Sequence, residues 1–302
     1  MSFDFARSDD GQMLVCVGRR LNLFNVANRE GICTSRPFPH PSCAAFSPDG
    51  GMLTVKHTSG RIVILDPLTG ATLYDHKNQK EGEGCEVRFS PDGAELIDAS
   101  WNGVVTTRKV RDQTITEREE FPGEMITRIS HDSKRDQWLF LHKPKVRPGG
   151  NWAPYCYLIL RKWPFAKHRT KQLSLGCYIE SATLSPDATR ICLIGSRRSG
   201  KKRIQILRAS TEKVLARSSA IAIGGTGCEL VWSADSKYVG SVQDRRFVFY
   251  RAAGLAIVGE VPCQYPSSIC FLPHGNQLAL GSWNSSMFVD VADVLAGKVR
   301  MP

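Results

Sequence analysis

The chain has 302 residues, enough for one large domain or two ordinary ones, and a chain of this length buries about three quarters of its unfolded surface. Apolar residues make up 42% and charged residues 23%, with 26 Gly and 16 Pro spread along the chain, which excludes a disordered, collagen-like or membrane-spanning protein. Lys and Arg outnumber Asp and Glu by 40 to 29, so the net charge of +11 indicates either an acidic partner or a solvated basic surface.

Seven related turns divide the chain into repeats. Residues 46–50 and 89–93 both read Phe-Ser-Pro-Asp-Gly, and weaker copies occur near the other positions. Pro presets a type I turn and Asp bonds neighbouring backbone amides, so each copy predicts a turn between two strands. With anchors near residues 8, 47, 90, 130, 185, 233 and 272, the spacings run from 39 to 55 residues. A four-stranded propeller blade takes about 40 to 45 residues.

The segments between anchors predict the strands of each blade. In the second repeat, apolar residues 52–55 and 62–65 flank a polar hairpin, and 71–75 follow as an outer strand. The third repeat has the same pattern, with 96–99 and 104–107 flanking 100–103. We therefore predict an all-β fold, a seven-bladed β-propeller with four antiparallel strands per blade, as one domain over residues 1–302.

The two ends of the chain complete the first and last blades in this prediction. Residues 1–6 supply an inner strand of the first blade, and residues 297–301 supply the outer strand of the last.

The repeats resemble those of the WD-repeat β-propeller family across the whole chain. The best matches are the Ser-Pro-Asp-Gly turns and residues 278–290, whose Trp283-Asn284 pair has its counterpart in Trp101-Asn102. No third strand ends in Trp-Asp and no Gly-His pair precedes a first strand, so the family's buried hydrogen-bonded tetrad is not carried over and the blades are expected to rely mostly on apolar packing. The resemblance implies a platform that binds proteins or peptides on its loops.

Motifs for catalysis are absent from the sequence. It has no Gly-rich phosphate loop, no His-Glu-x-x-His and no Gly-x-Ser-x-Gly. Gly84-Cys85-Glu86 and Gly227-Cys228-Glu229 recur in the third and sixth blades, where we expect a solvated channel mouth. We predict no enzyme activity, catalytic residue, cofactor or metal; a channel-centred hydrolase or lactonase is the least supported alternative.

The ten cysteines form no Cys-x-x-Cys pair and fall mainly in apolar segments, which predicts reduced packing residues. The first eleven residues lack an apolar signal segment. We therefore expect a cytoplasmic protein without membrane contact, monomeric by default.

The candidate binding residues gather in the hairpins between second and third strands. These windows hold 13 of the 40 basic residues and a single acid, Asp244. Exposed Trp and Arg are favoured at protein interfaces and also stack on unpaired bases. The predicted site comprises Arg19, Arg20, Arg61, Trp101, Asn102, Lys143, Lys145, Arg147, Trp152, Arg197, Arg198, Lys201, Lys202, Arg203, Arg245, Arg246, Trp283 and Asn284.

The expected partner is a protein or peptide with an acidic surface; RNA or another phosphorylated ligand is the alternative. A merely solvated set of loops, with Trp packed over blade ends, is the third interpretation. A second basic run, residues 161–171, falls on the opposite face and is interpreted as a solvated turn.

Overall fold

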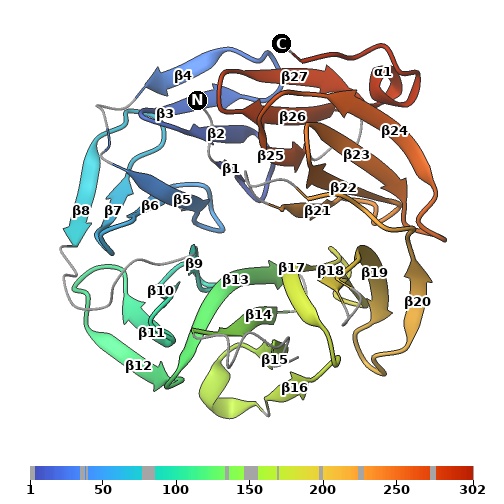
Figure 1. Cartoon of the computed structure of the whole chain (residues 1–302). Helices are drawn as coiled ribbons and strands as arrows, with labels where there is room; N and C mark the ends of the chain where they lie inside the picture. The colour runs from blue at the N-terminus through green and yellow to red at the C-terminus, as the bar shows by residue number, and fades with distance from the viewer. Residues whose placement is uncertain are drawn as a thin grey trace. The chain divides into compact units, whose positions relative to one another are not determined.

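The structure is a computed structural model that describes residues 4–34, 38, 40–76, 86–132, 136–145, 156–168, 170–196, 200–223, 228–272 and 277–301. Its contacts divide the chain into two compact units, residues 1–129 and 130–302. Antiparallel sheets make up both units, and consecutive sheets are numbered here as blades 1 to 7 (Figure 1).

The first unit holds blades 1 to 3, each a four-stranded sheet whose strands are in chain order. Blade 1 comprises β1 (Asp4–Arg7), β2 (Met13–Val17), β3 (Leu21–Asn25) and β4 (Gly31–Thr34). Blade 2 comprises β5 (Pro41–Phe46), β6 (Leu53–His57), β7 (Ile62–Leu65) and β8 (Thr72–His76). Blade 3 comprises β9 (Glu86–Phe89), β10 (Glu95–Ala99), β11 (Val104–Lys109) and β12 (Ile115–Glu120).

Blades 4 to 7 follow, the first strand of blade 4 beginning in the first unit. Blade 4 comprises β13 (Glu124–Asp132), β14 (Gln137–Pro144), β15 (Tyr157–Lys162) and β16 (Lys171–Leu173), with a 3-10 turn, η2, at Phe165–Lys167. Blade 5 comprises β17 (Tyr178–Leu184), β18 (Arg190–Ser196), β19 (Lys202–Arg208) and β20 (Val214–Arg217). Blade 6 comprises β21 (Leu230–Trp232), β22 (Tyr238–Gln243), β23 (Arg246–Arg251) and β24 (Ile257–Pro262). Blade 7 comprises β25 (Pro266–Phe271), β26 (Gln277–Ser282) and β27 (Ser286–Asp290).

Burial explains why the middle strands are continuous apolar runs and the outer strands are not. Every residue of β7 is buried, whereas β8 beside it is exposed or half-buried throughout. A strand covered on both faces has no polar side, so its sequence loses the period of two. Apolar clusters then join neighbouring blades within each unit, as between blades 1 and 2 or blades 6 and 7.

Five of the predicted anchors are turns with one shared hydrogen-bond pattern. In blade 2, the buried Ser47 hydroxyl donates to the carboxylate of Asp49 (2.5 Å) and accepts from the backbone N–H of Met52 (2.8 Å). The same carboxylate accepts the N–H of Gly51 at 3.0 Å. This Ser-x-Asp pattern recurs at Ser8, Ser90, Ser185 and Ser233.

The weak match near residue 130 is not such a turn, which corrects that anchor. Ser130 lies inside β13, and its hydroxyl accepts the N–H of Leu184 at 3.0 Å. The residues between β13 and β14, at 133–135, lie outside the described chain, as do 273–276 of the last anchor.

The prediction of an outer strand at residues 297–301 is wrong. After β27 the chain forms a short helix, α1 (Val291–Leu295), whose Val294 packs against Gly259 of β24. The tail then runs without strand pairing, and Met301 is buried against the core of blades 6 and 7. Blade 7 therefore has three strands within the described residues, while the predicted inner strand at the chain start is present as β1.

The all-β, seven-bladed propeller predicted from the repeats is confirmed. Whether the chain behaves as one domain stays a prediction, as do the compartment and the oligomeric state. No helix among the described residues is long and apolar enough to cross a membrane.

Candidate functional site

The antiparallel order places two kinds of loop at opposite ends of the strands in each blade. Hairpins between second and third strands lie at one end, called here the hairpin end, together with the loops leading into each first strand. The Ser-x-Asp turns lie at the other, the anchor end. The predicted site residues belong to the hairpin end.

In the first unit, two predicted contacts are exposed and one cation is already paired. Arg19 and Arg20 lie exposed in the hairpin between β2 and β3. Arg61, in contrast, donates two guanidinium hydrogen bonds to the carboxylate of Asp75 in the outer strand, with its Nε 2.7 Å from a carboxylate oxygen. The charge of Arg61 is therefore largely neutralised within its own blade.

Trp101 stands on a rigid hairpin. Its side chain is 41% exposed, with the exposed Asn102 beside it. Gly103 ends this hairpin at a φ of 76°, and a Cβ there would collide with the carbonyl oxygens of Phe121 and Glu124. Only glycine fits this close approach, so the backbone holds Trp101 in place.

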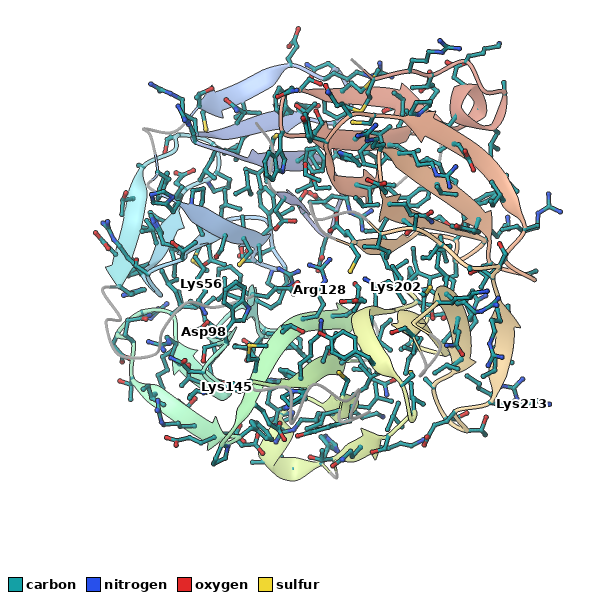
Figure 2. The ribbon with its side chains drawn as sticks, viewed as in Figure 1. Lys56, Asp98, Arg128, Lys145, Lys202 and Lys213 are labelled. Carbon is teal, nitrogen blue, oxygen red and sulfur yellow. The ribbon has the colours of Figure 1, made fainter. Side chains whose placement is uncertain are left out.

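In the second unit, Lys143 and Lys202 converge on one residue of β17. The Lys143 ammonium donates to the backbone carbonyl of Glu180 (3.0 Å) and lies 5.4 Å from the ring centre of Tyr178. Lys202 pairs with the Glu180 carboxylate at 2.7 Å (Figure 2). Lys143 is buried, and its hydrogen bond links blade 4 to blade 5. The sequence had predicted an exposed contact residue at this position.

The other basic residues of this unit divide into engaged and exposed groups. Arg203 donates to the carbonyl of Ser218 (2.9 Å), and Arg246 pairs with Glu260 on β24 (3.0 Å). Lys202, Arg203 and Arg246 lie in strands, since β19 and β23 begin earlier than the predicted hairpins end. Three of the predicted cations are exposed: Lys145, Lys201 and Arg245. Four predicted residues lie outside the described chain: Arg147, Trp152, Arg197 and Arg198.

An exposed aromatic pair marks the hairpin end of blades 6 and 7. The rings of Trp283 and Tyr265 stack at a centroid distance of 6.0 Å and an interplanar angle of 21°, and both side chains are more than 40% exposed. The backbone N–H of Trp283 donates to the backbone carbonyl of Tyr265 (3.1 Å), and the backbone N–H of Cys263 donates to the backbone carbonyl of Arg245 (3.0 Å). These backbone bonds hold the loops of blades 6 and 7 together at the hairpin end, and Arg245, Tyr265, Trp283 and the exposed Asn284 are named here the aromatic–arginine patch.

Sequence reasoning missed Tyr265. The residue precedes β25 in a loop that leads into a blade, and such loops share the hairpin end. The signal in the sequence is that shared position, which places aromatic residues of these loops beside the hairpins.

Buried charge joins blades 2 and 3, where mostly apolar packing was predicted. Lys56 of β6 is fully buried, and its ammonium pairs with the Asp98 carboxylate of β10 and donates to the carbonyl of Ala99 at 2.8 Å (Figure 2). Arg108 of β11 lies 3.8 Å from the same carboxylate and donates to Thr106 at 3.0 Å. These contacts add a polar cross-link to the apolar core between the blades.

Glu86 and Glu229, from the two recurring Gly-Cys-Glu motifs, accept hydrogen bonds from the backbone of the next blade. Each carboxylate accepts the N–H of an isoleucine on the first strand of the next blade, Ile129 at 3.1 Å and Ile269 at 3.0 Å. Glu86 is buried and also pairs with Arg128 (3.0 Å), which is labelled in Figure 2. Both glutamates therefore stabilise the contact between neighbouring blades. Three or more His, Cys, Asp or Glu side chains do not gather as metal ligands anywhere in the described ranges.

The nine described cysteines are free thiols, and six of them are buried. Burial raises the pKa of the Cys43 thiol to about 12, and it raises that of Cys192 as well. A thiol with a raised pKa is a poor nucleophile, so these two side chains suit packing and not chemistry.

The comparison with family models finds no match for this chain. Among solved structures, the chain is similar to hydrazine synthase of Kuenenia stuttgartiensis, with a TM-score of 0.77 and 14% identity over 96% of both chains. It is also similar to the β-propeller domain of Cps50 (Swd1) from Myceliophteria thermophila, with a TM-score of 0.73 and 12% identity over 96% of this chain and 97% of that one. At such identities the likeness shows the β-propeller fold alone.

Proposed function

We propose that this protein is a non-enzymatic interaction platform, a divergent WD-repeat propeller that binds an acidic segment of a partner protein at its hairpin end. The observation that carries the proposal is the aromatic–arginine patch, where a stacked Trp283–Tyr265 pair lies exposed beside Arg245. Large aromatic side chains and arginine supply most of the binding energy in protein interfaces. The Swd1 propeller domain, with its similar fold, supports the platform interpretation only at the level of architecture.

The geometry of the patch suits a peptide or a protein loop. The two rings stack on each other and a hydrogen bond joins their backbones, so little conformational entropy is lost when they are covered. Arg245 and Lys201 add exposed positive charge at the same end of blades 5 and 6. Apolar surface flanked by cations fits a segment that combines an apolar side chain with Asp or Glu.

The test is quantitative affinity capture from cells of the source organism. Trp283→Ala should weaken capture of the bound protein by about 30-fold, because a central aromatic is worth about 2 kcal/mol or more. Arg245→Ala should weaken it less, since charges at the rim act mainly on the association rate. The control carries Lys237→Ala and Arg251→Ala, two exposed cations at the anchor end of blade 6, and should capture normally. Equal capture by all variants contradicts the proposal.

RNA recognition is the second candidate, because the exposed stacked rings also suit unpaired bases. Binding of single-stranded oligouridine, measured against salt concentration, separates the two. Each phosphate contact contributes about 0.7 to the slope of log affinity against log salt, so a steep slope that becomes shallower in Arg245→Ala favours RNA. Weak binding without change in the variant favours a protein partner.

A further inference from the structure

A basic groove lies at the anchor end of the second unit, between blades 4 and 5. Its volume is about 860 Å³, within the range of about 300 to 1,000 Å³ typical of ligand sites. One wall comes from β15 and the segment that follows it, the other from the Ser185 turn and the end of β19. The charged and imidazole side chains that line it are Arg161, Lys162, His168, Lys171, Arg190 and Arg208.

The groove holds more positive charge than the protein neutralises. Five of the lining groups are permanent cations, and neither Asp nor Glu is among the described residues that line the groove. Two carboxylates lie nearby. Glu212 lies 3.5 Å from the Lys171 ammonium, and the carboxylate of Asp187 interacts electrostatically with Arg190. Lys162 and Arg208 are exposed and form no ion pair with the described residues. A net positive charge therefore remains for a ligand to neutralise.

Packing fixes the arginine on each wall before any ligand arrives. Arg161 is buried, with its guanidinium 4.6 Å from the ring centre of Phe165. The Arg190 guanidinium reaches towards blade 6, 4.8 Å from the ring centre of Trp232, and donates to the carbonyl of Ser236 at 2.9 Å, so Arg190 lies between the two grooves and lines both. Stacking on a ring holds a guanidinium without cancelling its charge. Arg161 and Phe165 are buried, so residues 161–171 are not the wholly solvated turn that the sequence predicted.

The neighbouring groove is smaller and carries less positive charge. Between blades 5 and 6, the equivalent space is about 490 Å³ and is lined by the cations Arg190, Lys237 and Arg251. Asp235 also lines it and pairs with Lys237 at 3.2 Å. The described lining of the larger groove has five cations and no carboxylate.

We propose that the groove between blades 4 and 5 binds a ligand that carries clustered phosphate groups, beyond the function proposed for the hairpin end. Planar guanidinium groups match phosphate oxygens bidentately, and each phosphate brings nearly two negative charges into a small volume. Carboxylates would need more space to supply the same charge. The phosphates belong either to a free polyphosphorylated molecule or to a phosphorylated protein segment.

Isothermal titration calorimetry on the full chain near physiological salt tests the proposal with three probes. Inorganic tripolyphosphate represents a free ligand, a doubly phosphorylated serine peptide represents a protein segment, and its unphosphorylated copy is the negative control. Binding by either phosphorylated probe supports the site and identifies the source of the phosphate. Binding by neither, or equal binding of the unphosphorylated peptide, overturns the proposal.

Charge reversal with a matched control locates the binding. Lys162→Glu with Arg208→Glu should weaken the phosphorylated probe by at least about tenfold. Lys237→Glu with Arg251→Glu makes the same change in net charge at the smaller groove and should alter binding by less than about twofold. Equal losses in the two variants would mean attraction by net charge alone and would overturn the site. Trp283→Ala should leave tripolyphosphate binding unchanged, so failure of this proposal is distinguishable from failure at the hairpin end.

Discussion

Removal of the Lys56 ammonium tests whether buried charge ties blade 2 to blade 3. In Lys56→Met the apolar stem keeps about its volume, but the Asp98 carboxylate and the Ala99 carbonyl lose a donor in a fully buried place. Breaking a buried pair from one side costs about 3 to 5 kcal/mol. Arg108, 3.8 Å from the carboxylate, still compensates part of its charge, so we expect about 3 kcal/mol. That is a large share of the roughly 5 to 15 kcal/mol that stabilises a folded domain.

Urea unfolding followed by circular dichroism, with a thermal melt beside it, measures this loss. We expect a lower urea midpoint with an unchanged slope, and a melting temperature lower by roughly 5 °C. Lys213→Met makes the same substitution at an exposed lysine and should change stability by less than about 0.5 kcal/mol. The double variant Lys56→Met with Asp98→Leu should lose less than Lys56→Met alone, because no buried carboxylate is left unpaired. A cost below about 1 kcal/mol for Lys56→Met would refute the reasoning.

Three further results follow from the backbone and the titratable groups. Gly103→Ala should cost at least about 2 kcal/mol in urea unfolding, whereas Gly123→Ala, at a similar φ of 79° but with open space around it, should cost only about 1 kcal/mol; equal costs would mean that the predicted collision is absent. The hydroxyls of the Ser-x-Asp turns hold the pKa of Asp10, Asp49 and Asp92 below 3.8, so the stability that these carboxylates contribute is present above about pH 4 and is lost as the pH falls through the lowered values. Ser90→Ala should therefore reduce the difference in urea midpoint between pH 6 and pH 3. An unchanged difference would contradict this role. Thiol titration of the denatured chain without reductant should find about ten free groups, and recovery of only a few would contradict the assignment to a reducing compartment.

Local signals in the sequence were enough for the repeat architecture. A Ser-Pro-Asp-Gly turn requires only residues within six positions of each other, and the hydrogen bonds of Ser47 and Asp49 are of this kind. The end of the chain was mispredicted because residues 297–301 alternate like a strand. The short helix before them packs Val294 against Gly259, 35 positions earlier, and no local pattern shows that contact.

The binding surface was predicted less well, because the fate of a charged side chain depends on its partners. Lys143 and Lys202 look alike in sequence, yet Lys143 is buried and donates to the Glu180 carbonyl of the next blade, whereas Lys202 pairs with the Glu180 carboxylate of its own blade. Arg61 similarly pairs with Asp75, and Arg246 with Glu260, in each case 14 positions later in the chain. Tyr265 stacks on Trp283, which lies 18 positions later in the chain, and no local sequence motif predicts that contact.

Site-specific photo-crosslinking tests the binding surface at the hairpin end most directly. A photoreactive residue replaces Asn284, beside an intact Trp283, and a matched chain carries it at Ala253, exposed at the anchor end of blade 6. In cells of the source organism, we predict a discrete protein adduct from position 284 that is lost on adding Trp283→Ala, with none from position 253. Equal adducts from both positions, no adduct from position 284, or an adduct there that ribonuclease removes would contradict binding of a protein partner at this surface.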